Sequence, residues 1–142
     1  MNFSATKPTI VFYEKQGCAG NARQKKLLNQ CGYELDVKNM LENHWSMDEL
    51  QSFFYGLGIN DIVNTSAPDI KNNLIDLEKT TKDDLVKMMI DKPLLIKRPL
   101  MIYNGHKLCG FDTNRLSEIL NVDISLLKGI STCQSDDACK SV

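Results

Sequence analysis

Hydrophobic positions in the first part of the chain predict two strands with a helix between them. Residues 10–13 form a short apolar run of the kind found in a buried central strand. Residues 20–31 suit a helix, and Gly32 provides its C-terminal stop. Apolar and polar side chains alternate over residues 33–37, which predicts a half-buried strand. The helix residues expected to face inward are Ala22, Leu27, Leu28 and Cys31.

The middle of the chain has the spacing of amphipathic helices. Ser46 and Glu49 form a capping-box pattern, in which the Ser46 hydroxyl caps a helix that Gly58 closes. Residues 60–73 are less regular and predict short helices and turns, and residues 81–92 predict a further helix. The apolar residues expected to face the core are Leu50, Phe53, Phe54 and Leu57 in the first helix and Leu85, Met88 and Met89 in the last.

The last third of the chain predicts a β-hairpin and a final helix. Asn104-Gly105 lies between two extended stretches, residues 94–103 and 106–110, and this dipeptide suits a turn with positive φ at both positions. Asp112 or Thr113 then begins a helix. Residues 131–142 are polar, which predicts a mobile tail.

The order of elements is therefore strand, helix, strand, a helical insert, a hairpin and a terminal helix. Short connections in the first unit imply a parallel pair of strands with a right-handed crossover. This order predicts an α/β protein of the thioredoxin type with a large helical insertion. We expect one domain over residues 1–128 and a tail over residues 129–142.

Composition excludes several classes of function. The chain has 142 residues and a net charge of -1, and its lysines are dispersed, which argues against nucleic-acid binding. No apolar run reaches membrane-spanning length and the N-terminus lacks the apolar core of a secretory signal, so a cytoplasmic protein is expected. The odd number of cysteines, 5, suits a reducing compartment. His44 and His106 are isolated, so no metal site is expected.

Cys18 is the residue whose position most favours chemical reactivity. It follows the first predicted strand and a glycine turn, and it precedes the first predicted helix. Unpaired N–H groups and the positive end of the helix dipole stabilise a thiolate there, and the thiolate is the nucleophilic form. The alternative is a small residue that fills a turn. Asn21 stands where a CxxC motif would have its second thiol.

These motifs together resemble the arsenate reductase (ArsC/Spx) family, a glutaredoxin-related branch of the thioredoxin fold. The resemblance covers about residues 8–127. It depends on Tyr13 five residues before Cys18, on the length of the helix up to Gly32, on residues 93–99 and on residues 107–109 after the hairpin turn. Within the family, residues 17–24 resemble the nitrogenase-associated subgroup.

The resemblance implies a cis peptide at Arg98-Pro99, close to the catalytic cysteine. Cys18 and Arg98 would then be catalytic, with Arg98 as a fixed cation that lowers the thiol pKa and holds an oxyanion. Arg23, Asn21 and Pro99 would bind the substrate. The alternative for Arg98 is a surface ion pair before an ordinary trans proline.

The chain also departs from the family pattern at several positions. Family arginines are absent at Ala22, at Gly110 and in residues 63–66, so efficient arsenate reduction is not expected. Asn21 removes the CxxC switch of the Spx-type regulators. Cys109 is expected to serve packing, and Cys31 is expected in the core.

Two functions remain open at this point. The first is a thiol oxidoreductase that acts on a small oxyanion or a disulfide, with no bound cofactor and with glutathione as the co-substrate that the family and the single thiol suggest. Glutaredoxin or another protein would be its partner, and Cys133 or Cys139 could act as the resolving thiol. The second is a non-catalytic partner-binding or regulatory protein that keeps only the fold and docks another protein, in a setting of nitrogen fixation or metal-cofactor metabolism that the subgroup resemblance implies.

Overall fold

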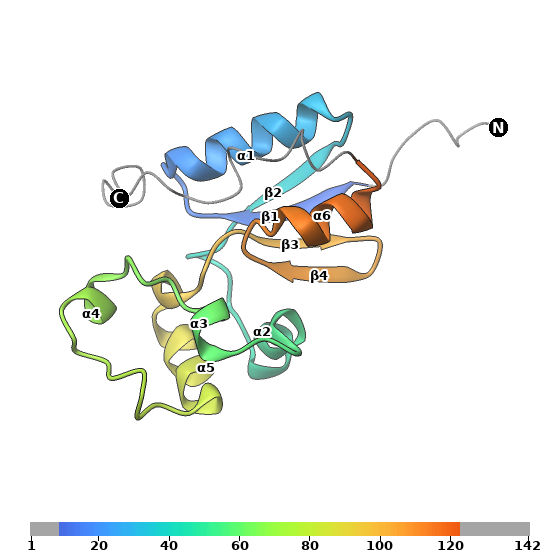
Figure 1. The fold of residues 1–142 in the computed structure, drawn as a ribbon. Coiled ribbons are helices and arrows are strands. Elements are labelled where there is room, and N and C mark those ends of the chain that lie inside the picture. Colours follow the sequence, from blue (N-terminus) through green and yellow to red (C-terminus); the bar gives the residue numbers. More distant parts are fainter. Residues whose placement is uncertain (1–8, 123–142) are drawn as a thin grey trace.

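The computed structural model describes residues 9–122, and Figure 1 shows a four-stranded sheet with helices on both sides. The strand order is β2-β1-β3-β4. β1 and β2 run parallel, whereas β1 pairs with β3 and β3 with β4 in antiparallel fashion. The strands are β1 (Ile10–Glu14), β2 (Leu35–Asn39), β3 (Leu100–Tyr103) and β4 (His106–Cys109). This is the predicted thioredoxin-like arrangement with its helical insert.

Two hydrophobic clusters cover the two faces of the sheet. Because side chains alternate along a strand, Ile10 and Phe12 of β1 face one cluster while Tyr13 faces the other. The first cluster contains residues of α1 (Ala19–Gln30) and α6 (Thr113–Leu120). The second packs the helical insert against the opposite face, below the sheet in Figure 1. β1, at the centre of the sheet, is therefore covered on both faces, which fixes its register.

The helical insert begins and ends as its capping residues predict. Ser46 accepts a hydrogen bond from the Glu49 N–H at the start of α2, and Thr81 accepts one from the Asp84 N–H at the start of α5. Between them lie two single turns, as the irregular sequence indicated. The helices of the insert are α2 (Met47–Phe54), α3 (Ile59–Ile62), α4 (Pro68–Lys71) and α5 (Lys82–Asp91).

The predicted hairpin and final helix are also present. Asn104 and Gly105 have φ values of 51° and 82°, as a turn of this kind requires. Asp112 caps α6 through hydrogen bonds from the backbone N–H groups of Asn114 and Arg115.

Four local expectations are wrong. Ala22 is exposed, because α1 buries the face that carries Gly20, Asn21, Gln24 and Leu28. β2 begins at Leu35 and is largely exposed rather than half-buried, because it is an edge strand. α2 ends at Phe54, and Gly58 instead caps α3. The extended stretch predicted from residue 94 starts as a 3-10 turn, η2 (Pro93–Leu95), before β3 begins at Leu100.

Within residues 9–122 no helix is both long and apolar enough to cross a bilayer. The predicted boundary between residues 128 and 129, the tail, and Cys133 and Cys139 lie outside the described residues.

Candidate active site

A tight turn places Cys18 at the N-terminus of α1. Gly17 has a φ of 86°, a value that few other residues adopt without strain, and the Cys18 N–H donates to the Lys15 carbonyl at 3.1 Å. Cys18 is the N-cap residue, and its carbonyl accepts the first helical hydrogen bond, from the Ala22 N–H. The strand–turn–helix order read from the sequence therefore delivers the thiol to the helix start.

The Cys18 sulfur lies in surroundings that favour the thiolate. The residue is only 4% exposed, and burial by itself raises the pKa of the thiol. The Asn21 N–H, the Arg98 side chain and the Gly20 N–H act in the opposite direction, and together they lower the pKa below its ordinary value. The Cys18 side chain makes no N-cap hydrogen bond, so the Gly20 and Asn21 N–H groups remain available to a negative charge on the sulfur.

Arg98 reaches this thiol from the segment that leads into β3. Its peptide bond to Pro99 is cis, as the family resemblance implied. The Pro99 carbonyl accepts a hydrogen bond of 2.8 Å from the Gly110 N–H, which ties this segment to the end of β4. The Nε and Nη1 atoms of Arg98 are buried and have no hydrogen-bond partner among the described residues. Buried donors of this kind are suited to an anionic group.

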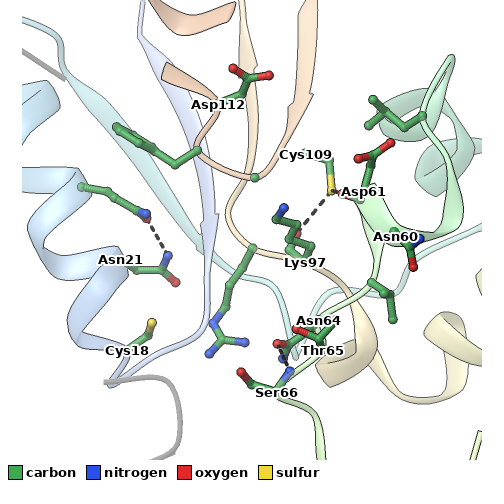
Figure 2. Close-up of a pocket in the computed structure, with 16 residues that line it drawn as sticks. Cys18, Asn21, Asn60, Asp61, Asn64, Thr65, Ser66, Lys97, Cys109 and Asp112 are labelled. Atoms are coloured by element: carbon green, nitrogen blue, oxygen red, sulfur yellow. Dashed lines mark hydrogen bonds between the residues drawn. The ribbon is translucent and has the colours of Figure 1, made fainter. Parts of the chain in front are cut away.

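Cys18 and Arg98 line a cavity of about 500 Å³. Figure 2 shows Cys18 and Asn21 on the α1 side of this cavity, and Asn64, Thr65 and Ser66 of the α3–α4 loop across from them. Asp61, Lys97, Cys109 and Asp112 line it further along. A cavity of this size accommodates a small organic molecule. The Cys18 thiol is thus open to the cavity although little of it reaches bulk solvent.

The sequence-predicted residues are brought together only in part. Cys18, Asn21 and Arg98 line the cavity, whereas Arg23 is exposed on α1 and does not. Pro99 is buried beside Arg98 and is not among the lining residues. The Asn21 side chain is occupied internally: Oδ1 accepts from the Lys15 N–H and Nδ2 donates to Gln24 Oε1.

Lys15 is a residue that the sequence reasoning missed. It is buried, and burial and the nearby Arg98 charge both lower the pKa of its ammonium, while the Cys18 sulfur raises it. Lys15 therefore lies within electrostatic range of both Cys18 and Arg98. Its place in the turn before the cysteine was the available signal.

Cys109 is a second thiol in the cavity, but its surroundings differ from those of Cys18. Burial raises the pKa of Cys109 to about 12, and its Sγ lies 3.4 Å from the Lys97 carbonyl oxygen as a hydrogen-bond donor. A thiol that stays protonated is a poor nucleophile, in keeping with the packing role expected for it. No cluster of potential metal ligands occurs among residues 9–122.

The fold and the site together define the class of this protein. A parallel β-α-β start, an antiparallel hairpin and a cysteine at the first helix define a thioredoxin-like α/β protein with a helical insertion. Residues 13–119 match the model of the ArsC family, and the chain belongs to this family.

Individual relatives are distant. The chain is 29% identical to an uncharacterized 15.7 kDa protein in the draG 3' region of Rhodospirillum rubrum, over 89% of this chain and 88% of that one. It is 25% identical to the global transcriptional regulator Spx 2 of Bacillus anthracis, over 78% and 86%. The arsenate reductase from Vibrio cholerae is similar in structure, with a TM-score of 0.64, 23% identity and coverage of 83% of this chain and 100% of that one.

Proposed function

We propose that this protein is a thiol oxidoreductase with one nucleophilic cysteine, Cys18. The observation that carries the proposal is the meeting of Cys18, with its lowered thiol pKa, and the buried, unpartnered nitrogens of Arg98 in one cavity. The helix N-terminus stabilises the Cys18 thiolate, and Arg98 attracts an anionic group of the substrate to the same place. Neither feature is needed for a cysteine that only fills a turn.

The proposed reaction is thiol–disulfide exchange. The Cys18 thiolate attacks one sulfur of a substrate disulfide, so a bond from Cys18 to that sulfur forms while the substrate S–S bond breaks. The other substrate sulfur leaves as a thiolate. A low-molecular-weight thiol of the glutathione class, as its thiolate, then attacks the mixed disulfide and releases Cys18. The incoming thiol ends in a disulfide with the substrate sulfur that Cys18 held, so its electron pair replaces the one that left with the first thiolate.

A disulfide is a better candidate substrate than arsenate. Among residues 9–122, Arg98 is the only arginine that lines the cavity, and the wall opposite Cys18 carries the uncharged Asn64, Thr65 and Ser66. Lys97 also lines the cavity, but Asp61 and Asp112 line it as well and offset the two positive charges, which disfavours a multiply charged oxyanion. A disulfide substrate that places one carboxylate beside Arg98 suits this charge distribution.

The link to nitrogen fixation continues to depend on the resemblance of residues 17–24 to the nitrogenase-associated subgroup.

The test compares the protein with Cys18→Ser and Cys31→Ser variants. Turnover of a mixed disulfide of glutathione and 2-mercaptoethanol is measured with glutathione as the reductant. Glutathione reductase then consumes NADPH as it reduces the glutathione disulfide formed, and arsenate is supplied in a parallel arm. The expected result is activity that Cys18→Ser abolishes and Cys31→Ser retains, with little or none towards arsenate. Equal activity in all three proteins would refute the proposal. Strong arsenate-dependent activity would show that arsenate, rather than a disulfide, is the substrate.

A partner-binding protein without catalysis is the second candidate. Tyr55 is 91% exposed and Leu74 is 72% exposed, so both side chains are free to add apolar contact area to a partner. The similarity to a transcriptional regulator is compatible with a docking role. A Cys18 pKa at or above that of free cysteine, about 8.5, together with absence of turnover, would favour this candidate.

A further inference from the structure

Asn21 has an unusual position for a polar side chain. It is 2% exposed, and both ends of its amide are engaged: Oδ1 accepts from the Lys15 N–H at 3.0 Å, and Nδ2 donates to Gln24 Oε1 at 2.9 Å. Gln24 is also buried and lies one turn further along α1. The amide thus links the end of β1 to the body of the helix.

The segment that this amide holds is the turn that carries Cys18. Lys15 is joined at one end to Asn21 through its N–H, and at the other to the Cys18 N–H through its carbonyl. The turn is thus closed on both sides by hydrogen bonds. Asn21 is also the third residue of α1, so its own N–H belongs to the unpaired group at the helix N-terminus. The same residue thus holds the turn through its side chain, while its backbone N–H helps to lower the pKa of the Cys18 thiol.

We propose that Asn21 is a positioning residue, whose buried amide fixes the Lys15–Cys18 turn and thereby holds its own backbone N–H towards the Cys18 sulfur. This role differs from the substrate binding expected of Asn21 from the family resemblance, because its amide is engaged within the protein. The inference deepens the proposed function, since it concerns the same reactive thiol.

Asparagine meets the requirements of this position better than its relatives. An acceptor is needed for the Lys15 N–H and a donor for Gln24, and the asparagine amide supplies both. Aspartate would keep the acceptor but lose the donor, and it would add a negative charge near the thiolate. Cysteine would supply neither bond well. The residue that stands in place of the second cysteine of a CxxC motif is thus also the one that orders the turn.

Other charges around the thiol remain in place when this amide is removed. Arg98 approaches from the segment before β3, and Lys15 contributes from the turn itself. Asp61, Lys97 and Asp112 line the same cavity from the helical insert, the segment before β3 and the β4–α6 loop. A change in Cys18 ionisation on loss of the Asn21 amide therefore reports the geometry of the turn.

The experiment measures Cys18 ionisation without any substrate. The full-length protein is labelled with iodoacetamide over a range of pH, and the rate at Cys18 is followed by peptide-resolved mass spectrometry. Asn21→Ala removes the amide, and Asn29→Ala is the matched control because Asn29 is exposed on the same helix. For Asn21→Ala we expect the midpoint to rise by about one pH unit, with labelling about tenfold slower at neutral pH. Asn29→Ala is expected to match the unmodified protein.

A second variant guards against loss of folding. Gln24→Met removes the acceptor of the Asn21 Nδ2 donor at nearly constant size, and labelling about twofold slower is expected. If Asn21→Ala does not fold, this variant decides the matter. A folded Asn21→Ala protein, or failing that Gln24→Met, with an unchanged Cys18 midpoint would overturn the inference. Because no disulfide is turned over, failure of the proposed reaction would leave this result interpretable.

Discussion

Val63 and Ile96 form an isolated antiparallel bridge between the helical insert and the segment that leads into β3. Hydrogen bonds of 2.8 Å flank it, from the Asn64 N–H to the Leu95 carbonyl and from the Lys97 N–H to the Ile62 carbonyl. Arg98 follows Lys97 in the chain, so these hydrogen bonds fix the backbone immediately before it. The insert thus supplies one wall of the cavity and also anchors the segment that carries the cation.

The first prediction concerns this cation. Arg98→Ala removes the positive charge beside the sulfur, so the Cys18 pKa should rise by about one unit or more. Turnover of an anionic mixed disulfide should also fall more than tenfold, because a charge-assisted contact is lost. Arg23→Ala is the matched control, since Arg23 is exposed and does not line the cavity. Equal losses in both variants would show that general surface charge, rather than Arg98, attracts the substrate.

A second prediction compares two adjacent aromatic residues at the end of α2. Phe54 is completely buried in the cluster beneath the sheet, so Phe54→Ala should lower the free energy of unfolding by about 3–5 kcal/mol. Tyr55 is 91% exposed, and Tyr55→Ala should change it by less than about 0.5 kcal/mol. Urea unfolding followed by circular dichroism measures both. A similar loss in the two variants would contradict the packing described for this helix.

The third prediction is a loss of stability at alkaline pH. Burial raises the pKa of Cys109 to about 12, so the folded protein keeps this proton where the unfolded chain has released it. Fewer protons bound in the unfolded state mean that the free energy of unfolding falls as the pH rises from about 9 towards 12. Burial raises the pKa of Tyr33 to about 12 as well, which adds to the loss in the upper part of this window.

Urea unfolding at about pH 8 and about pH 10.5 measures this effect, with Cys109→Ala as the comparison. The variant should lose less stability between the two conditions, because one of the groups responsible is absent. An equally steep loss in the variant would assign the effect to other groups.

The fourth prediction concerns the start of α5. Thr81→Ala removes the acceptor for the Asp84 N–H, and the free energy of unfolding should fall by about 1 kcal/mol. Thr81→Ser keeps an oxygen at the same place and should restore most of the stability. A serine variant as unstable as the alanine variant would mean that the methyl group, rather than the hydrogen bond, matters here.

The sequence alone determined the order of the elements and the place of Cys18. Local rules suffice for both: capping residues such as Ser46, the Asn104-Gly105 turn and the spacing of apolar residues act over a few positions. Cys18 at the start of α1 follows from the same local order. Periodicity was less successful at Ala22 and along β2, because exposure there depends on which neighbours pack against the helix and on β2 being an edge strand.

Only the tertiary structure decided which polar residues meet the thiol. Arg98 reaches the cavity while Arg23, much closer to Cys18 in sequence, does not, because the helix directs Arg23 to solvent and the sheet brings the segment before β3 alongside β1. The burial of Lys15 and the inward amide of Asn21 likewise depend on packing between elements. Burial and long-range charge set the ionisation of a thiol, and neither is a property of the neighbouring residues alone.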